Sequence, residues 1–221
     1  MLEAHYRAVA DEGDLPIVVY NVPGRTGTNV DAATLLRLAE HPRIVAVKEA
    51  SANLEQMMTI ARDRPAGFSV LSGDDSWTYA LLALGGDGVI SVASNEVPGA
   101  LVAMCSAARA GDWATARELH ERYLELFRIN FIAPNPVPVK AALAAMGIIT
   151  TDALRRPLLA LDDGARGRLI DVMAALGLTT TRSTTATPSA PTMTTSTGSA
   201  NGTSSQDPNR TTRRTATPAV V

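Results

Sequence analysis

Four short apolar runs, each followed by a polar loop, punctuate the first 96 residues. They are rich in Val, Ile and Leu and occupy residues 15–20, 44–47, 68–71 and 89–93. Continuous apolar runs of this length predict strands that are buried on both faces, as in a parallel sheet. Stretches with helical spacing of apolar residues precede or separate them, at residues 2–12, 31–40, 51–64 and 77–84. This repeated strand, loop and helix pattern predicts a parallel βα fold.

The alternation ends after residue 96, where the chain changes to helical patterns alone. These patterns predict helices at residues 98–111, 113–129, 136–146 and 164–176. From Thr179 onward, Thr, Ser, Pro, Ala, Asn and Gly replace most apolar residues, so the segment cannot bury enough surface to offset the entropy of ordering. We therefore predict four βα units over 1–96, a helical region over 97–178 and a disordered tail over 179–221.

The composition excludes several classes of function. The net charge of −2 gives no electrostatic basis for binding nucleic acid or an anionic membrane surface. No apolar run approaches the length of about 20 residues that a membrane span requires. The single cysteine, Cys105, excludes an intrachain disulfide and fits a buried helical thiol in a reducing compartment. We expect a cytoplasmic globular protein.

The strand at 44–47 ends at Lys48, and the functional interpretation depends on this residue. One interpretation is that the side chain extends along the apolar surface and places its ammonium group in water. The other is that the amine lies in a partly dry site, where desolvation lowers its pKa and leaves a neutral amine that attacks a carbonyl group. The strand pattern alone leaves both interpretations open.

Five motifs, taken in order along the chain, resemble those of a known family. They are YNVPGRTG at 20–27, KEAS at 48–51, LSGDD at 71–75, GGDGVISV at 85–92 and PNPVPVK at 134–140. Together they resemble the dihydrodipicolinate synthase / N-acetylneuraminate lyase family of class I pyruvate-dependent aldolases, over roughly residues 2–178. The resemblance implies a TIM (β/α)8 barrel of which this chain holds the C-terminal half, followed by a helical extension. It also implies tetramer assembly.

The resemblance implies a role for each of five residues. Lys48 would form an imine with the ketone of pyruvate, and Tyr20 would move protons. Arg25 would bind the carboxylate of aspartate semialdehyde, which favours the synthases over the sialic-acid lyases. Gly73 would allow a close backbone approach to the ligand, and the backbone of Ile90 would contact pyruvate. The chemistry needs no cofactor beyond the covalent imine, and its implied product is 4-hydroxy-tetrahydrodipicolinate.

The residue patterns by themselves leave a structural alternative for four of these residues. Tyr20 and Ile90 also fit core positions at strand ends. Arg25 also fits a solvated loop arginine, and Gly73 an ordinary turn glycine. We assign no role to His5, His41 and His120, which are scattered. We expect no metal at Asp74–Asp75, because no histidine cluster accompanies the pair.

The chain departs from the family pattern at its beginning, where the first strand corresponds to the fifth of a complete barrel. Half a barrel leaves two open strand edges and an uncovered apolar face. Exposing apolar surface to water costs about 25 cal/mol of folding free energy per Å². We hypothesise that the chain alone is inactive and prone to aggregate, or that it pairs with another half. The alternatives are a different pyruvate aldolase, acting on a keto-deoxy sugar or sialic acid, and an inactive fragment that binds a full-length homologue.

Overall fold

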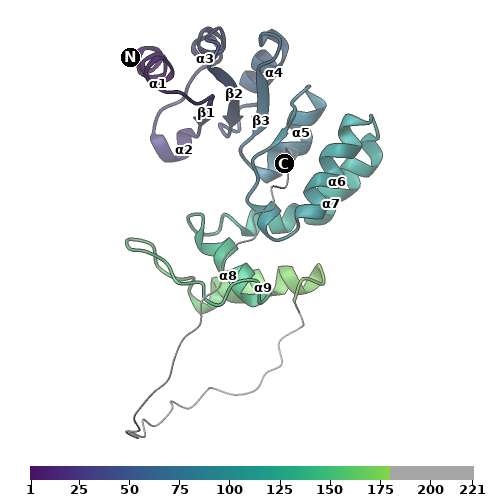
Figure 1. The fold of residues 1–221 in the computed structure, drawn as a ribbon. Coiled ribbons are helices and arrows are strands. Elements are labelled where there is room, and N and C mark those ends of the chain that lie inside the picture. The colour runs from purple at the N-terminus through teal and green to yellow at the C-terminus, as the bar shows by residue number, and fades with distance from the viewer. Residues whose placement is uncertain (180–221) are drawn as a thin grey trace, which may run out of the picture. The chain divides into compact units, whose positions relative to one another are not determined.

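A computed structural model describes residues 1–179, and four parallel strands form one sheet within them (Figure 1). The strands pair in sequence order and are β1 (Ile17–Asn21), β2 (Ile44–Glu49), β3 (Ser69–Ser72) and β4 (Gly88–Val89). Since neighbouring strands run parallel, each connection crosses over the sheet, as in a barrel wall. The predicted βα repeat is confirmed, while residues 180–221 of the predicted tail lie outside the described part of the chain.

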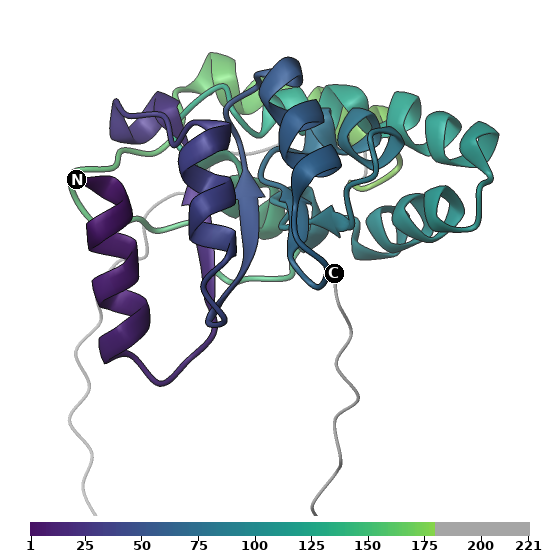
Figure 2. The ribbon, with the colours of Figure 1, turned by 90° about the horizontal axis from the view of Figure 1, so that it is seen from above.

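Three helices cover one face of the sheet (Figure 2). They are α1 (Leu2–Glu12), α3 (Ala32–Ala39) and α4 (Leu54–Asp63). Alternate strand residues face them, and the buried core between the two layers includes Val19, Val47 and Val70 from the strands. The side chains of Asp31 and Asn53 accept backbone N–H groups at the starts of α3 and α4. The start of α3 agrees with the prediction, whereas α4 begins three residues later than the predicted 51 because Asn53 is its capping residue.

The opposite face of the sheet is partly open, which corrects the prediction of strands buried on both faces. On β1, Val18 is 44% exposed and Tyr20 is 37% exposed, whereas Val19 between them is fully buried. No helix of the described residues covers this face of β1 as α1 and α3 cover the other. The long apolar runs therefore reflect a second packing surface that these residues leave uncovered.

Two further predictions about local structure are wrong. The YNVPGRTG segment contains the short helix α2 (Pro23–Thr26) instead of an unbroken loop, because Pro23 suits a first helical position and Gly27 ends the turn with φ +69°. The fourth strand is confined to β4 (Gly88–Val89) instead of 89–93. After Ile90 the backbone turns into the 3₁₀ helix η2 (Ala93–Asn95).

The helical region that follows packs around a second core. A 3₁₀ turn, η1 (Asp75–Trp77), leads into α5 (Thr78–Ala83), and four longer helices follow β4. These are α6 (Pro98–Arg109), α7 (Trp113–Ile129), α8 (Val137–Ala145) and α9 (Asp163–Ala175). Leu101, Leu126, Phe127 and Leu169 are among the fully buried residues that join them. Among the described helices, none has both the length and the apolarity needed to cross a membrane.

Candidate active site

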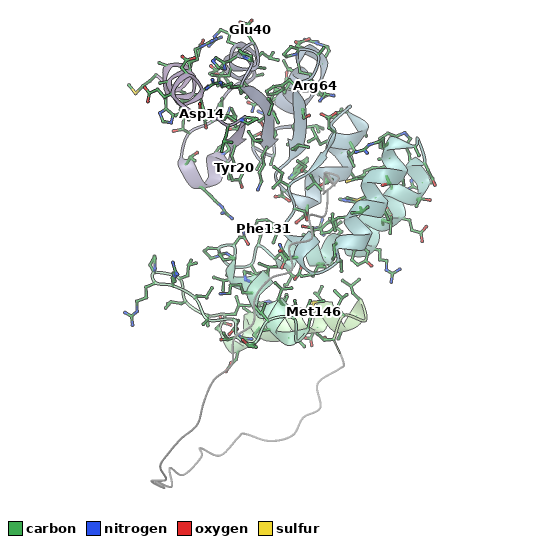
Figure 3. All side chains as sticks on the ribbon, viewed as in Figure 1. Asp14, Tyr20, Glu40, Arg64, Phe131 and Met146 are labelled. Atoms are coloured by element: carbon green, nitrogen blue, oxygen red, sulfur yellow. The ribbon has the colours of Figure 1, made fainter. Side chains whose placement is uncertain are left out.

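Two of the predicted site residues lie side by side on neighbouring strands. Tyr20 on β1 pairs with Lys48 on β2, and Lys48 pairs in turn with Leu71 on β3. Side chains alternate between the two faces of a strand, so Tyr20 and Lys48 project from the open face, opposite buried Val19 and Val47. Figure 3 shows Tyr20 on the side of β1 away from α1 and α3. Both residues lie near the carboxyl ends of their strands, where βα barrels place their active sites.

The amine of Lys48 lies over the ring of Tyr20, with 4.3 Å between Nζ and the ring centroid. Partial burial lowers the pKa of Lys48, and the positive charge of Arg25 lowers it further, while the negative charge of Asp75 opposes the change. The contact with the aromatic face also favours the charged form. Burial together with the charge of Arg25 outweighs the charge of Asp75, so the pKa of Lys48 lies below that of a lysine in water.

Arg25 lies on α2 with an exposed side chain, and its charge reaches the Lys48 amine. The backbone N–H of Arg25 donates to the Val22 carbonyl over 2.9 Å, and Gly27 donates to Pro23 over 2.9 Å. The Thr26 hydroxyl bridges the Val22 and Thr28 carbonyls at 3.2 and 2.9 Å. These bonds fix the backbone of the turn while leaving the guanidinium free to meet a carboxylate.

Gly73 approaches the stem of Lys48 so closely that a larger residue does not fit. A Cβ atom at this position would lie 2.8 Å from Ala50 Cβ and 3.0 Å from Lys48 Cγ. The backbone N–H of Gly73 donates to the Glu49 carbonyl over 2.7 Å, which holds the turn after β3 against the end of β2. The absence of a side chain at Gly73 thus leaves room for the lysine stem, while the predicted approach of this residue to a ligand stays a prediction.

Ile90 continues the line of strand ends one residue beyond β4. Its backbone N–H donates to the Ser72 carbonyl over 2.8 Å, and its side chain is half-buried. Asp75, which is fully buried, holds the next turn because one carboxylate oxygen accepts the N–H groups of Val92 and Ala93 at 3.0 and 2.9 Å. Burial raises the pKa of Asp75, and the hydrogen bonds partly offset this.

The other residues considered in the sequence make local structural contacts or are partly buried. Asp74 accepts the Ser76 N–H at 2.9 Å and begins η1, and the described residues contain no group of three or more His, Cys, Asp or Glu able to hold a metal ion. His41 pairs with Asp11 over 3.0 Å, and His120 stacks on Tyr79 with 5.6 Å between ring centroids. Cys105 is half-buried on α6, and burial raises the pKa of its thiol, as predicted for an inert cysteine.

A buried polar pair that was not predicted from the sequence lies behind the lysine. Asn21 and Glu49 are 1% and 0% exposed, and they form the next pair along β1 and β2 after Tyr20 and Lys48. A carboxylate at the end of an apolar strand is itself unusual, since buried acids are rare unless they are paired. That signal is present in the sequence, immediately after Lys48.

The fold and the site define a βα protein that presents a partly buried lysine amine with a lowered pKa at the carboxyl edge of a parallel sheet. The comparisons with known proteins narrow this class. The Dihydrodipicolinate synthetase family matches residues 1–176, and the chain belongs to this family.

Curated and solved relatives agree with this assignment. The 4-hydroxy-tetrahydrodipicolinate synthase of Koribacter versatilis is 49% identical over 174 residues, covering 79% of this chain and 58% of the relative. The dihydrodipicolinate synthase structure from Thermotoga maritima matches with a TM-score of 0.78 at 40% identity, over 80% of this chain and 61% of that one. The chloride-inhibited dihydrodipicolinate synthase from Acinetobacter baumannii, complexed with pyruvate, matches with a TM-score of 0.77 at 38% identity, over 80% and 60%. The chain thus spans about 60% of the length of the relatives it matches, and the predicted half of a barrel with a helical extension is confirmed.

Proposed function

We propose that this chain carries the imine-forming part of a 4-hydroxy-tetrahydrodipicolinate synthase, which condenses pyruvate with aspartate semialdehyde. The observation that supports this most strongly is the half-buried Lys48 amine, whose pKa is lowered beside Arg25 and over the Tyr20 ring. The names of the relatives and the pyruvate complex of the Acinetobacter baumannii structure support the same chemistry. The single cysteine fits a reducing compartment, so we place this chemistry in the cytoplasm.

The first step of the proposed reaction joins Lys48 covalently to pyruvate. The neutral amine adds to the ketone of pyruvate to give a carbinolamine, and uptake of a proton with loss of water gives a protonated imine. The positive nitrogen withdraws electrons, so the methyl group loses a proton and an enamine forms. Tyr20 is the group we propose to move this proton, since a phenol beside the amine can accept and return it.

The second step joins the two substrates. The enamine carbon adds to the aldehyde carbon of aspartate semialdehyde, and the aldehyde oxygen takes up a proton. The amino group of the semialdehyde then attacks the imine carbon and displaces Lys48, which closes the ring and restores the free amine. Arg25 binds the semialdehyde carboxylate through its planar guanidinium. Gly73 and the backbone of Ile90 border the pyruvate at the ends of the neighbouring strands.

Turnover and imine formation make different demands on the structure. Imine formation needs a neutral amine, which the partial burial of Lys48 favours, and an open approach to it, which the uncovered face beside Tyr20 supports. Orienting the aldehyde toward the enamine carbon needs an enclosed binding site. In the described residues, however, the sheet face that carries Tyr20 is open. We therefore propose that Lys48 reacts with pyruvate in this chain, and that full turnover and the tetramer assembly implied by the family need the further βα units of the longer relatives.

The sequence makes the test unusually direct, because Lys48 and Lys140 are its two lysines. The purified chain is incubated with pyruvate and borohydride, and the trapped adduct is located by mass spectrometry. We expect one reduced pyruvate on Lys48, loss of the adduct in Lys48→Arg and its retention in Lys140→Arg. Labelling of Lys140 alone, or equal labelling of both lysines, would contradict the proposal.

A further inference from the structure

A second residue pair lies directly behind the reactive pair. Tyr20 pairs with Lys48, and the next register position pairs Asn21 with Glu49. Since neighbouring side chains on a strand point to opposite faces, Asn21 and Glu49 project into the layer beneath the helices while Tyr20 and Lys48 project from the open face. The two pairs are adjacent along the backbones of β1 and β2. A displacement of the backbone at Asn21 and Glu49 therefore also displaces Tyr20 and Lys48.

Glu49 is a buried carboxylate that is surrounded by neutral donors. Its two oxygens accept from Asn21 Nδ2 at 3.2 and 3.0 Å, from Gln56 Nε2 at 3.2 Å and from the backbone N–H of Ser51 at 2.7 Å. Across residues 1–179, Glu49 forms no ion pair with Lys, Arg or His. A buried charge without a counter-charge is costly unless several donors hold it, and these donors are fixed in place by three different elements.

Asn21 extends the same contacts to the segment that carries Arg25. Its Oδ1 accepts the backbone N–H of Val30 at 3.0 Å, and its Nδ2 also donates to Asn29 Oδ1 at 2.9 Å. Asn29 and Gln56 are themselves bonded at 2.9 Å, which closes the network onto α4. The network therefore joins the end of β1, the end of β2, the start of α4 and the far end of the Arg25 turn.

The backbone of Glu49 also touches the lysine stem through Gly73. The Glu49 carbonyl accepts the Gly73 N–H at 2.7 Å, and the Cα of Gly73 faces Lys48 Cγ with no space for a methyl group. The direction of the Lys48 side chain thus depends on where the Glu49 peptide lies. The Glu49 side chain projects to the opposite face of the sheet from Lys48, so its contact with the lysine runs through the backbone and Gly73.

We propose that Asn21 and Glu49 are positioning residues that set the place of the Lys48 amine relative to Tyr20 and Arg25. An apolar pair at this site would fill the space at a lower desolvation free energy. It would not form the directional hydrogen bonds that join the ends of β1 and β2, the start of α4 and the far end of the Arg25 turn. The proposal rests on the proposed function for its meaning in catalysis. The placement of the Lys48 amine in a partly buried position can be measured without pyruvate.

The test measures the reactivity of Lys48 by reductive methylation with formaldehyde across a pH series, with Lys140 as the internal reference. Glu49→Gln turns an acceptor into an amide whose NH₂ group meets the donors of Asn21 and Gln56. We expect Lys48 to move toward water, its pH profile to shift toward that of an ordinary lysine, and its rate at neutral pH to fall about tenfold. The profile of Lys140 should stay unchanged.

A double variant provides the rescue. In Asn21→Asp with Glu49→Gln, the direction of the hydrogen bond is reversed, because the new carboxylate accepts from the new amide and still accepts the Val30 N–H. We expect the double variant to restore the Lys48 profile, while Asn21→Asp alone disturbs it by placing two carboxylates together. Glu55→Gln, the same change at an exposed residue of α4, is the matched control.

The outcomes separate a positioning role from a structural one. Lower thermal stability of Glu49→Gln with an unchanged Lys48 profile would overturn the proposal, and so would failure of the double variant to restore a shifted profile. If Glu49→Gln does not fold, Asn29→Ala weakens the network from its exposed edge and must shift the profile in the same direction. Failure of pyruvate to react with the unaltered chain would count against the proposed function alone, since the formaldehyde profile is independent of it.

Discussion

The amine of Lys48 lies 4.3 Å from the centroid of the Tyr20 ring, and the two residues are direct neighbours across β1 and β2. The aromatic face attracts the ammonium form, whereas partial burial favours the neutral form. The hydroxyl group of Tyr20, in contrast, is what the proposed proton transfer requires. One residue thus has two separable contributions, from its ring and from its oxygen.

Tyr20→Phe and Tyr20→Leu separate these contributions. Tyr20→Phe keeps the ring, so we expect the methylation profile of Lys48 to be unchanged while enamine formation, followed by deuterium exchange into the pyruvate methyl group, slows by about 100-fold. Tyr20→Leu removes the ring as well and should lower the pKa of Lys48, because the ammonium loses its aromatic contact. Equal exchange rates in Tyr20→Phe and the unaltered chain would exclude the phenol as the proton carrier.

Arg25 is expected to act on Lys48 through charge. Its positive charge lowers the pKa of Lys48, so Arg25→Gln should raise that pKa and reduce the neutral fraction of the amine at any pH below it. The methylation profile should shift to higher pH, and the difference should shrink in high salt because Arg25 is exposed.

Arg25→Lys separates the charge of this residue from its shape. It should keep the Lys48 profile but weaken carboxylate binding, since an ammonium lacks the planar fork. Arg37→Gln, which removes an exposed arginine paired with Glu3, serves as the control for overall charge. A profile that moves equally in Arg37→Gln would show that the effect is not local.

The elements that depend on local pattern were predictable from the sequence. The helix at 113–129 has the bounds predicted for it, because Asp112 accepts the Thr115 N–H at its start and the apolar spacing is regular. Strand β2 was likewise evident from the unbroken apolar run at 44–47, although it continues to Glu49. Such signals lie within a few residues of one another, so a single sequence carries them.

The features that depend on distant contacts were not predictable. The fourth strand stops early because Asp75, far back in the chain, takes the N–H groups of Val92 and Ala93 that a longer strand would use. The role of Glu49 depends on Gln56 and Asn21, which approach it only in the folded chain. The periodicity of apolar residues gives no information about either set of contacts.

Gly73→Ala should displace Lys48 without changing its charge. The added methyl group would meet Ala50 Cβ at 2.8 Å and Lys48 Cγ at 3.0 Å, so either the turn after β3 or the lysine stem must move. We expect a loss of stability of about 1–3 kcal/mol and a fall in borohydride trapping at Lys48. Gly24→Ala, where a Cβ meets nothing within 4 Å, is the control. Normal trapping in Gly73→Ala would show that the lysine tolerates the contact.

Glu96 should make the stability of the chain depend on pH. It is 5% exposed, and its Oε2 accepts from Asn130 Nδ2 at 2.6 Å, which connects the end of η2 to the end of α7. Burial raises the pKa of Glu96 from 4.5 to about 7, with the charge of Asp75 adding to the effect and the Asn130 hydrogen bond opposing it. The folded chain therefore binds a proton at Glu96 more tightly than the unfolded chain does.

The sign of the dependence follows from this difference in proton binding. Between pH 4.5 and about 7 the folded state holds more protons at Glu96, so stability falls as pH rises through this window. The whole difference corresponds to roughly 3 kcal/mol. Glu96→Gln cannot ionise and keeps an amide partner for Asn130. We expect it to be more stable than the unaltered chain at pH 8 and to lose that advantage at pH 5, as measured by urea unfolding. Glu118→Gln, at an exposed residue of α7, should show no such crossover, and a constant difference for Glu96→Gln at both pH values would mean that Glu96 does not titrate in this window.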